Sequence, residues 1–163
     1  MRLGKKLSFW TRQRDGDKGT LLAYTVVMRV LLADDCAPVR WALGTFLREQ
    51  LGWTIVGEVA HSEALLAKAL ALRPELILMA WELPGQPAGT AVGLLRRQLG
   101  SCKIVVLDQN SSVRGAALRA GADAFICKIG PPHEVLSVLR EVGVNPAHNP
   151  PRGGPRQICQ TQS

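Results

Sequence analysis

Charged side chains follow several short apolar runs in this chain, and their types suit phosphate chemistry. Asp34 and Asp35 come after the first run, Asp108 after a later one and Lys128 after the last. Carboxylates are ligands that Mg²⁺ prefers in proteins, and a lysine ammonium neutralises phosphoryl oxygens. If the runs are parallel strands, their carboxyl ends meet at one edge of a sheet, where open α/β folds bind ligands. The four side chains therefore predict a site for a metal ion and a phosphoryl group.

One further run, Leu76–Ala80, leads to the same edge without a reactive group. It is wholly apolar and is followed by the loop-forming pair Pro84-Gly85, which is typical of a buried strand that delivers its last residues to a loop. The methyl group of Ala80 cannot act as a nucleophile. This loop is therefore expected to line the functional edge without supplying the group that reacts.

Each charged residue also has a simpler explanation when it is taken alone. Asp34 and Asp35 could cap a helix, and Lys128 could be a solvated loop charge. Their shared position at predicted strand ends favours the site over these explanations.

Five apolar runs alternate with five segments of helical period between residues 29 and 142. Because parallel strands need helical crossovers, this order predicts an α/β fold with a three-layer, doubly wound, five-stranded parallel sheet. The last helical segment shows the expected i, i+3, i+4, i+7 spacing of apolar residues. The predicted strands are Val30–Ala33, Thr54–Ala60, Leu76–Ala80, Ile104–Leu107 and Ala124–Cys127.

The helical segments have recognisable ends. Pro38 suits the first turn of a helix that stops before Gly52. Ser62 is predicted to cap the second helix, and Ser111 or Ser112 the fourth.

The net charge of +7 lies outside the region of strands and helices. The excess is +5 in residues 1–29, zero in residues 30–142 and +2 in the remainder. A neutral domain does not favour specific nucleic-acid binding. Met28 is an alternative natural start of the chain. We expect a basic, disordered arm over residues 1–28, a folded domain over 29–142 and a Pro/Gly-rich, disordered tail over 143–163.

The composition also bears on location and redox chemistry. No window offers the ~18 uncharged apolar residues of a membrane span, and the basic start is not followed by the apolar segment of a signal peptide. We expect a cytoplasmic protein that does not bind membranes. The cysteines, which lack any Cys-x-x-Cys spacing, favour buried, inert thiols over a zinc site or disulfides, with a redox pair of Cys36 or Cys127 as the alternative.

The chain resembles the receiver domain of two-component response regulators over about residues 29–142. The resemblance rests on Val30 to Asp35, Leu76 to Gly85, Ala120 to Phe125, and Lys128. It implies a flavodoxin-like sheet with strand order 2-1-3-4-5, an acid pair that binds Mg²⁺, an aspartate ending the third strand that accepts phosphate, and a Ser or Thr ending the fourth. It also implies a lysine that reads the phosphate charge and an aromatic that switches rotamer. Carried over, these are Asp34 and Asp35, Lys128 and Phe125.

The chain departs from the family pattern at the residues that handle phosphate. The acceptor position is Ala80, and the hydroxyl position is Asp108. Ile129 follows the lysine where the family usually has a cis proline, and the loop after Gly85 is one residue longer. These departures predict a degenerate receiver, a pseudo-receiver that lacks the phosphoacceptor aspartate.

Two expectations for the site follow from these departures. Asp108 is expected to pair with Lys128, which would replace a phosphate-dependent contact with a permanent one. No cofactor is expected to be required, and Mg²⁺ is expected to bind only weakly, through Asp34, Asp35 and the backbone carbonyl of Glu82.

The resulting functional hypothesis is a stand-alone receiver-like domain in two-component (phosphorelay) signal transduction. It would act as a phosphorylation-independent protein-interaction module and not as an enzyme.

Its partner would be a histidine kinase, another regulator or an output protein, and a homodimer is compatible with the same surface. No DNA-binding helix-turn-helix follows residue 142, so direct transcriptional output is not expected. The surface would be the last strand and its flanking helices, with the charges of Arg114, Arg119, Arg140 and Glu141.

Three alternatives stay open. The first is a phosphorylatable switch that uses Asp108 or Asp35 as a surrogate acceptor. The second is a small Mg²⁺-dependent phosphatase, which is disfavoured because no nucleophilic aspartate stands at an Asp-x-Asp spacing. The third is nucleic-acid binding through the basic arm.

Overall fold

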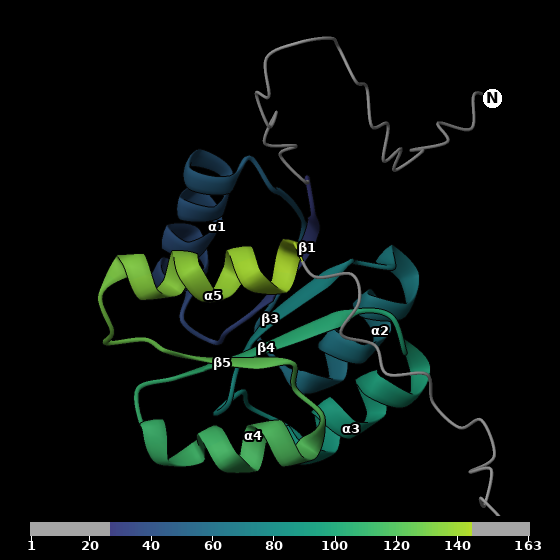
Figure 1. The fold of residues 1–163 in the computed structure, drawn as a ribbon. Coiled ribbons are helices and arrows are strands. Elements are labelled where there is room, and N and C mark those ends of the chain that lie inside the picture. Colours follow the sequence, from purple (N-terminus) through teal and green to yellow (C-terminus); the bar gives the residue numbers. More distant parts are fainter. Residues whose placement is uncertain (1–26, 145–163) are drawn as a thin grey trace, which may run out of the picture.

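The computed structural model describes residues 27–144, which form a five-stranded parallel sheet with helices on both faces (Figure 1). The strand order is β2-β1-β3-β4-β5, and every neighbouring pair is parallel. The predicted α/β class and strand order are confirmed. The strands are β1 (Arg29–Ala33), β2 (Thr54–Val59), β3 (Leu76–Ala80), β4 (Lys103–Asp108) and β5 (Ala124–Cys127).

The helices divide between the two faces of the sheet. In Figure 1, α1 and α5 cover one face, and α2, α3 and α4 cover the other. A short 3-10 turn, η1, leads directly into α4. The helices are α1 (Ala37–Leu51), α2 (Ser62–Leu72), α3 (Ala88–Gln98), η1 (Ser111–Val113), α4 (Arg114–Ala120) and α5 (Pro132–Val144).

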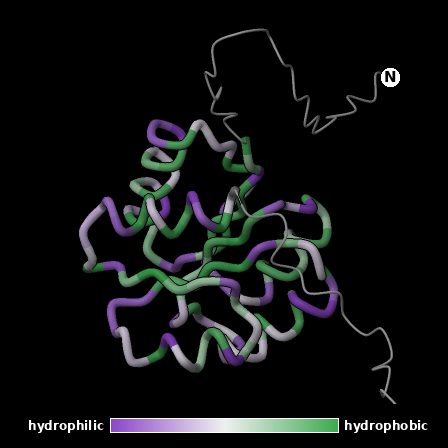
Figure 2. The backbone as a smooth tube through the Cα atoms, in the orientation of Figure 1, coloured by the Kyte–Doolittle hydropathy of each residue, from purple (hydrophilic) through white to green (hydrophobic). Residues whose placement is uncertain are grey.

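Two hydrophobic clusters fill the space on either side of the sheet. Successive strand residues point to opposite faces, so Leu32 packs with Leu47 of α1 and Leu139 of α5, whereas Leu31 packs with Leu65 of α2. All the residues of β3 are buried, as expected for the central strand of a sheet covered on both sides. Figure 2 shows the hydrophobic stretches of backbone gathered in the sheet at the centre of the domain.

The ends of the helices agree with the sequence predictions at some positions and differ at others. Gly52 follows α1, as predicted, but Ser62 does not cap α2. His61 occupies the cap position, and the Ser62 hydroxyl accepts a hydrogen bond from the backbone N–H of Gln86. The side chain of Asn110, and not of a serine, caps η1. At η1 a neighbouring side chain therefore takes the role that residue type suggested for serine, whereas at α2 no side chain caps the helix.

The folded part begins and ends slightly outside residues 29–142. Met28 is buried, and its carbonyl accepts a hydrogen bond from the N–H of Thr54. At the other end α5 continues to Val144, and Gly143 lies against Trp53 and Met28. The expectations of a disordered arm and tail concern residues 1–26 and 145–163, which lie outside the described residues. No helix of the described part has the length and apolar character needed to cross a bilayer.

Candidate functional site

The carboxyl edge of the sheet brings together the residues that the sequence singled out. Asp34 follows β1, Ala80 ends β3, Asp108 ends β4 and Lys128 follows β5. The registers of the parallel ladders place Ala80 beside Leu107 and Asp108 beside Cys127. These side chains therefore stand at the same edge, as the sequence predicted.

An ion pair between Asp34 and Lys128 is the central feature of this edge. The ammonium Nζ of Lys128 lies 2.5 Å from Oδ2 of Asp34, across 94 positions of sequence. The Asp34 side chain is 2% exposed and the Lys128 side chain 23%. A carboxylate that is almost wholly removed from water needs a compensating partner, and Lys128 supplies the positive charge.

The remaining polar groups of Asp34 are also engaged. Its Oδ1 accepts a hydrogen bond from the N–H of Cys36 at 2.9 Å, and its own N–H donates to the carbonyl of Val59. Its carbonyl accepts from Nη1 of Arg40 at 2.6 Å, and Arg40 also forms an ion pair with Glu58. Arg40 was not singled out from the sequence, although its place in the first turn of α1, next to the acid pair, was a usable hint. These contacts hold the carboxylate in one orientation.

The expected pair between Asp108 and Lys128 is wrong. Oδ1 of Asp108 accepts a hydrogen bond from the N–H of Asn110 at 2.6 Å, and the ion pair of Lys128 is with Asp34. Asp108 and Lys128 do meet, but through the backbone, where the N–H of Lys128 donates to the carbonyl of Asp108 at 2.8 Å. The half-buried Asp108 satisfies its carboxylate locally, so the lysine goes to the more deeply buried acid.

Ala80 presents a methyl group where β3 reaches the edge. It is 4% exposed, and the following N–H, that of Trp81, donates to the carbonyl of Leu107. Asp35 and Glu82 are exposed beside it. The carboxyl end of the central strand therefore offers no nucleophile.

A family model described as the response regulator receiver domain matches residues 30–140. The chain belongs to this family. The sheet order and the acid pair and lysine at the carboxyl edge agree with the resemblance seen in the sequence.

Named relatives of this chain include a transcriptional activator and a response regulator. The transcriptional activator protein ExaE of Pseudomonas putida is 31% identical over 117 residues, which are 71% of this chain and 55% of that protein. The response regulator protein VraR of Staphylococcus aureus is 28% identical over 118 residues, 71% of this chain and 56% of that protein. The chain thus spans little more than half the length of these relatives.

Solved structures of receiver domains share the fold. The receiver domain of AraT from Geobacillus stearothermophilus has a TM-score of 0.62 and 25% identity, over 73% of this chain and 95% of that chain. The response regulator domain of Thermotoga maritima CheB has a TM-score of 0.65 and 24% identity, over 76% of this chain and 99% of that chain.

The receiver family implies Mg²⁺ at the acid pair, and the residues as arranged here do not fit that ion. Both carboxylate oxygens of Asp34 are engaged, one by an ammonium, and Asp108 is turned onto the N–H of Asn110. Within residues 27–144, no group of three or more His, Cys, Asp or Glu side chains is placed to hold a metal ion. This arrangement does not favour the weak Mg²⁺ site expected at Asp34, Asp35 and the Glu82 carbonyl.

Phe125, the position of the family's switching aromatic, is directed into the core. It is 9% exposed and pairs with Val106 across the β4–β5 ladder. Its cluster includes Ala117 of α4 and the partly buried Trp81. The aromatic therefore packs between the sheet and α4.

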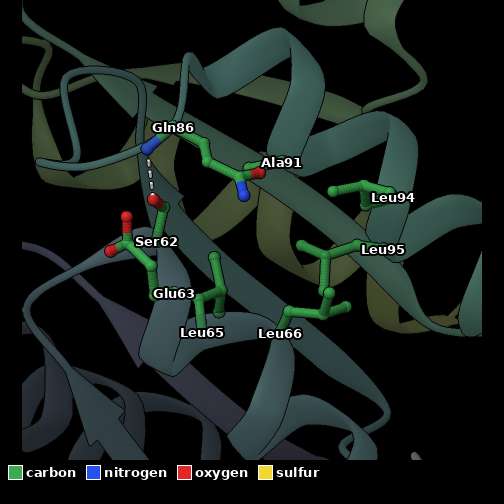
Figure 3. Close-up of a pocket in the computed structure, with 8 residues that line it drawn as sticks. All are labelled: Ser62, Glu63, Leu65, Leu66, Gln86, Ala91, Leu94 and Leu95. Atoms are coloured by element: carbon green, nitrogen blue, oxygen red, sulfur yellow. Dashed lines mark hydrogen bonds between the residues drawn. The ribbon is translucent and has the colours of Figure 1, made fainter.

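The loop that follows β3 is fastened to the start of α2. The N–H of Ser62 donates to the carbonyl of Pro84, and the N–H of Gln86 donates to the Ser62 hydroxyl at 2.6 Å. Figure 3 shows this contact at one end of a cavity of about 220 Å³ between α2 and α3. Leucines and Ala91 form most of its lining, and Glu63 and Gln86 stand at the polar end. The lining includes neither Asp34 nor Lys128, so this cavity is separate from the carboxyl-edge site.

The cysteines differ in their environments. Cys102 is buried, and this burial raises the pKa of its thiol to about 12, so the reactive thiolate is scarce at neutral pH. The prediction of a buried thiol is confirmed there, but Cys36 is exposed and Cys127 is partly buried. Cys159 lies outside the described residues.

Proposed function

We propose that this chain is a receiver domain of two-component (phosphorelay) signalling that works without aspartyl phosphorylation. In this proposal it is a pseudo-receiver that acts as a protein-interaction module in the cytoplasm and catalyses no reaction. The observation that carries the proposal is the methyl group of Ala80 at the end of β3, where the family places the aspartate that accepts phosphate. A methyl group cannot form an acyl phosphate.

The ion pair at the edge supports the same proposal. In a phosphorylated receiver the lysine would form an ionic contact with the phosphoryl group, whereas here Lys128 forms an ion pair with the buried carboxylate of Asp34. The half-buried carboxylate of Asp108 adds negative charge nearby, which would repel phosphoryl oxygens. The conformation of the β4 and β5 ends is then set by the sequence and not by a modification.

The proposed partner is a protein of the same signalling system: a histidine kinase, another regulator or an output protein. The surface formed by α4, β5 and α5 carries the exposed charges Arg114, Arg119, Arg140 and Glu141. Mixed charge of this kind favours a polar protein surface or a second copy of the chain as the partner. Specific nucleic-acid binding by this domain is not part of the proposal.

Incubation with acetyl phosphate and Mg²⁺, followed by intact-mass measurement, tests the proposal. We expect no species heavier by one phosphoryl group, while a receiver domain that retains its acceptor aspartate gains that mass in parallel. A stable adduct on the wild-type chain would contradict the proposal. If Asp108→Ala or Asp35→Ala then abolished the adduct, the chain would be a switch with a surrogate acceptor.

A further inference from the structure

The buried carboxylate of Asp34 has a built-in cation. It is 2% exposed, and the ammonium of Lys128 is the positive group that lies 2.5 Å from it. Its second oxygen accepts a hydrogen bond from the N–H of Cys36 at 2.9 Å. The charge of this carboxylate is thus balanced by the chain itself.

From this arrangement, we propose that Lys128 replaces the divalent cation of the receiver family and excludes Mg²⁺ from the acid pair. The ammonium occupies the side of Asp34 that a metal ion would need, and a divalent ion placed there would be repelled by it. Lys128 then acts as a permanent internal cation, and the site does not respond to Mg²⁺.

The requirements of the ion lead to the same conclusion. Mg²⁺ demands near-octahedral oxygen ligands at about 2.0–2.1 Å and gives up its water reluctantly, so it is usually held by carboxylates together with phosphate oxygens. At this edge Ala80 supplies a methyl group, and Asp108 is committed to Asn110. Asp35 and Glu82 are left as the exposed carboxylates at this edge, and neither is held in place by a hydrogen bond or ion pair among the described residues, which is too little to displace Lys128 from Asp34.

The inference is independent of the proposed function. Freedom from phosphorylation depends on the missing group at Ala80, whereas exclusion of the metal depends on Lys128. If the wild-type chain bound Mg²⁺ and yet gained no phosphoryl group, the inference would fail and the proposed function would stand. If the chain gained a phosphoryl group but showed no saturable Mg²⁺ binding, the proposed function would fail and the inference would stand.

The test is a Mg²⁺ titration of the full chain, followed by NMR and by the thermal midpoint. We expect the wild type and Lys128→Arg, which keeps the cation, to show no saturable response at millimolar Mg²⁺. Lys128→Met frees the buried carboxylate and should bind Mg²⁺ at least about tenfold more tightly than the wild type, a change of ~1.4 kcal/mol. The double variant Lys128→Met with Asp34→Asn should lose that gain.

Two results would overturn the inference. The first is saturable Mg²⁺ binding by the wild type at the acid pair, which Mn²⁺ would report independently of any variant by broadening the NMR signals of Asp34 and its neighbours. The second is a folded Lys128→Met that binds Mg²⁺ no better than the wild type. If Lys128→Met folds only when Mg²⁺ is added, the dependence of folding on the ion supports the inference.

Discussion

The deeper burial of Asp34 explains why Lys128 forms an ion pair with Asp34 and not with Asp108. Asp34 and Asp108 both stand at strand ends within the same edge, but Asp34 is 2% exposed, whereas Asp108 keeps part of its surface in water. An ion pair relieves a desolvated carboxylate more than a solvated one. Asp108 is also satisfied by the N–H of Asn110 only two residues away. The difference in environment, and not the order of the strands, sets the pair.

The loop after β3 requires glycine at position 85. Its φ is +110°, and a Cβ atom there would lie 2.6 Å from the Glu63 carboxylate oxygens as well as against the Ser62 hydroxyl. Gly85→Ala should therefore lower the free energy of unfolding by about 1–3 kcal/mol through backbone strain and the displaced side chains. Urea denaturation followed by circular dichroism measures the change.

Gly93 provides the matched control for that substitution. It lies within α3, and apart from its chain neighbours and the backbone of its own helix nothing lies within 4 Å of the place that a Cβ atom would take. Gly93→Ala should raise stability by about 0.5–1 kcal/mol because alanine loses less backbone entropy in a helix. Equal effects of the two substitutions would show that the loop does not require glycine at position 85.

At the scale of elements, Arg96 joins α3 to the start of β4 and to the turn before β5. Its guanidinium donates to the carbonyls of Gly121 and Cys102, and Nη2 lies 2.6 Å from Oδ2 of Asp123. The same carboxylate oxygen accepts from the N–H of Ile104 at 2.8 Å. This network lies at the beginnings of the strands, opposite the candidate site, and holds together the elements that carry Asp108 and Lys128.

Arg96→Ala should destabilise the domain by about 2–3 kcal/mol, because buried carbonyls and the Asp123 carboxylate lose a charged donor. Its neighbour Arg97 is exposed and, among residues 27–144, donates a hydrogen bond to the carbonyl of Gly93 within its own helix and to no other group. Arg97→Ala should stay within about 0.5 kcal/mol of the wild type. Thermal unfolding of the two variants side by side distinguishes them, and equal losses would refute the role of the network.

The sequence predicted the elements well and the contacts among polar groups less well. Strands such as Leu76–Ala80 could be predicted because a short, fully apolar run between turn residues is typical of a buried strand. Ser62 was misassigned as a cap because its hydroxyl bonds to Gln86, a residue 24 positions away that only the folded chain brings near. The ion pair of Lys128 with Asp34, and not with Asp108, could likewise not be predicted from the sequence. It depends on the burial of Asp34, which the whole sheet creates.

At the scale of the whole molecule, the domain keeps the receiver architecture and changes the chemistry of one edge. The sheet order is the one that the family resemblance implied, and the acid pair and Lys128 stand at the edge where the resemblance places them. Ala80 carries a methyl group at the position where the resemblance places the acceptor, and Lys128 forms an ion pair with Asp34 of its own chain. This combination supports the proposed role as a protein-interaction module, because function depends on the site and not on the fold alone.

An NMR titration of the chain with Mg²⁺ and beryllofluoride, a mimic of the bound phosphoryl group, tests this account most directly. The account predicts no saturable shifts at Lys128 or Phe125, because the acceptor carboxylate is missing and Lys128 remains on Asp34. A receiver domain that retains its acceptor aspartate should show large shifts at the corresponding positions under the same conditions. Large, saturable shifts at Lys128 and Phe125 of this chain would contradict the account.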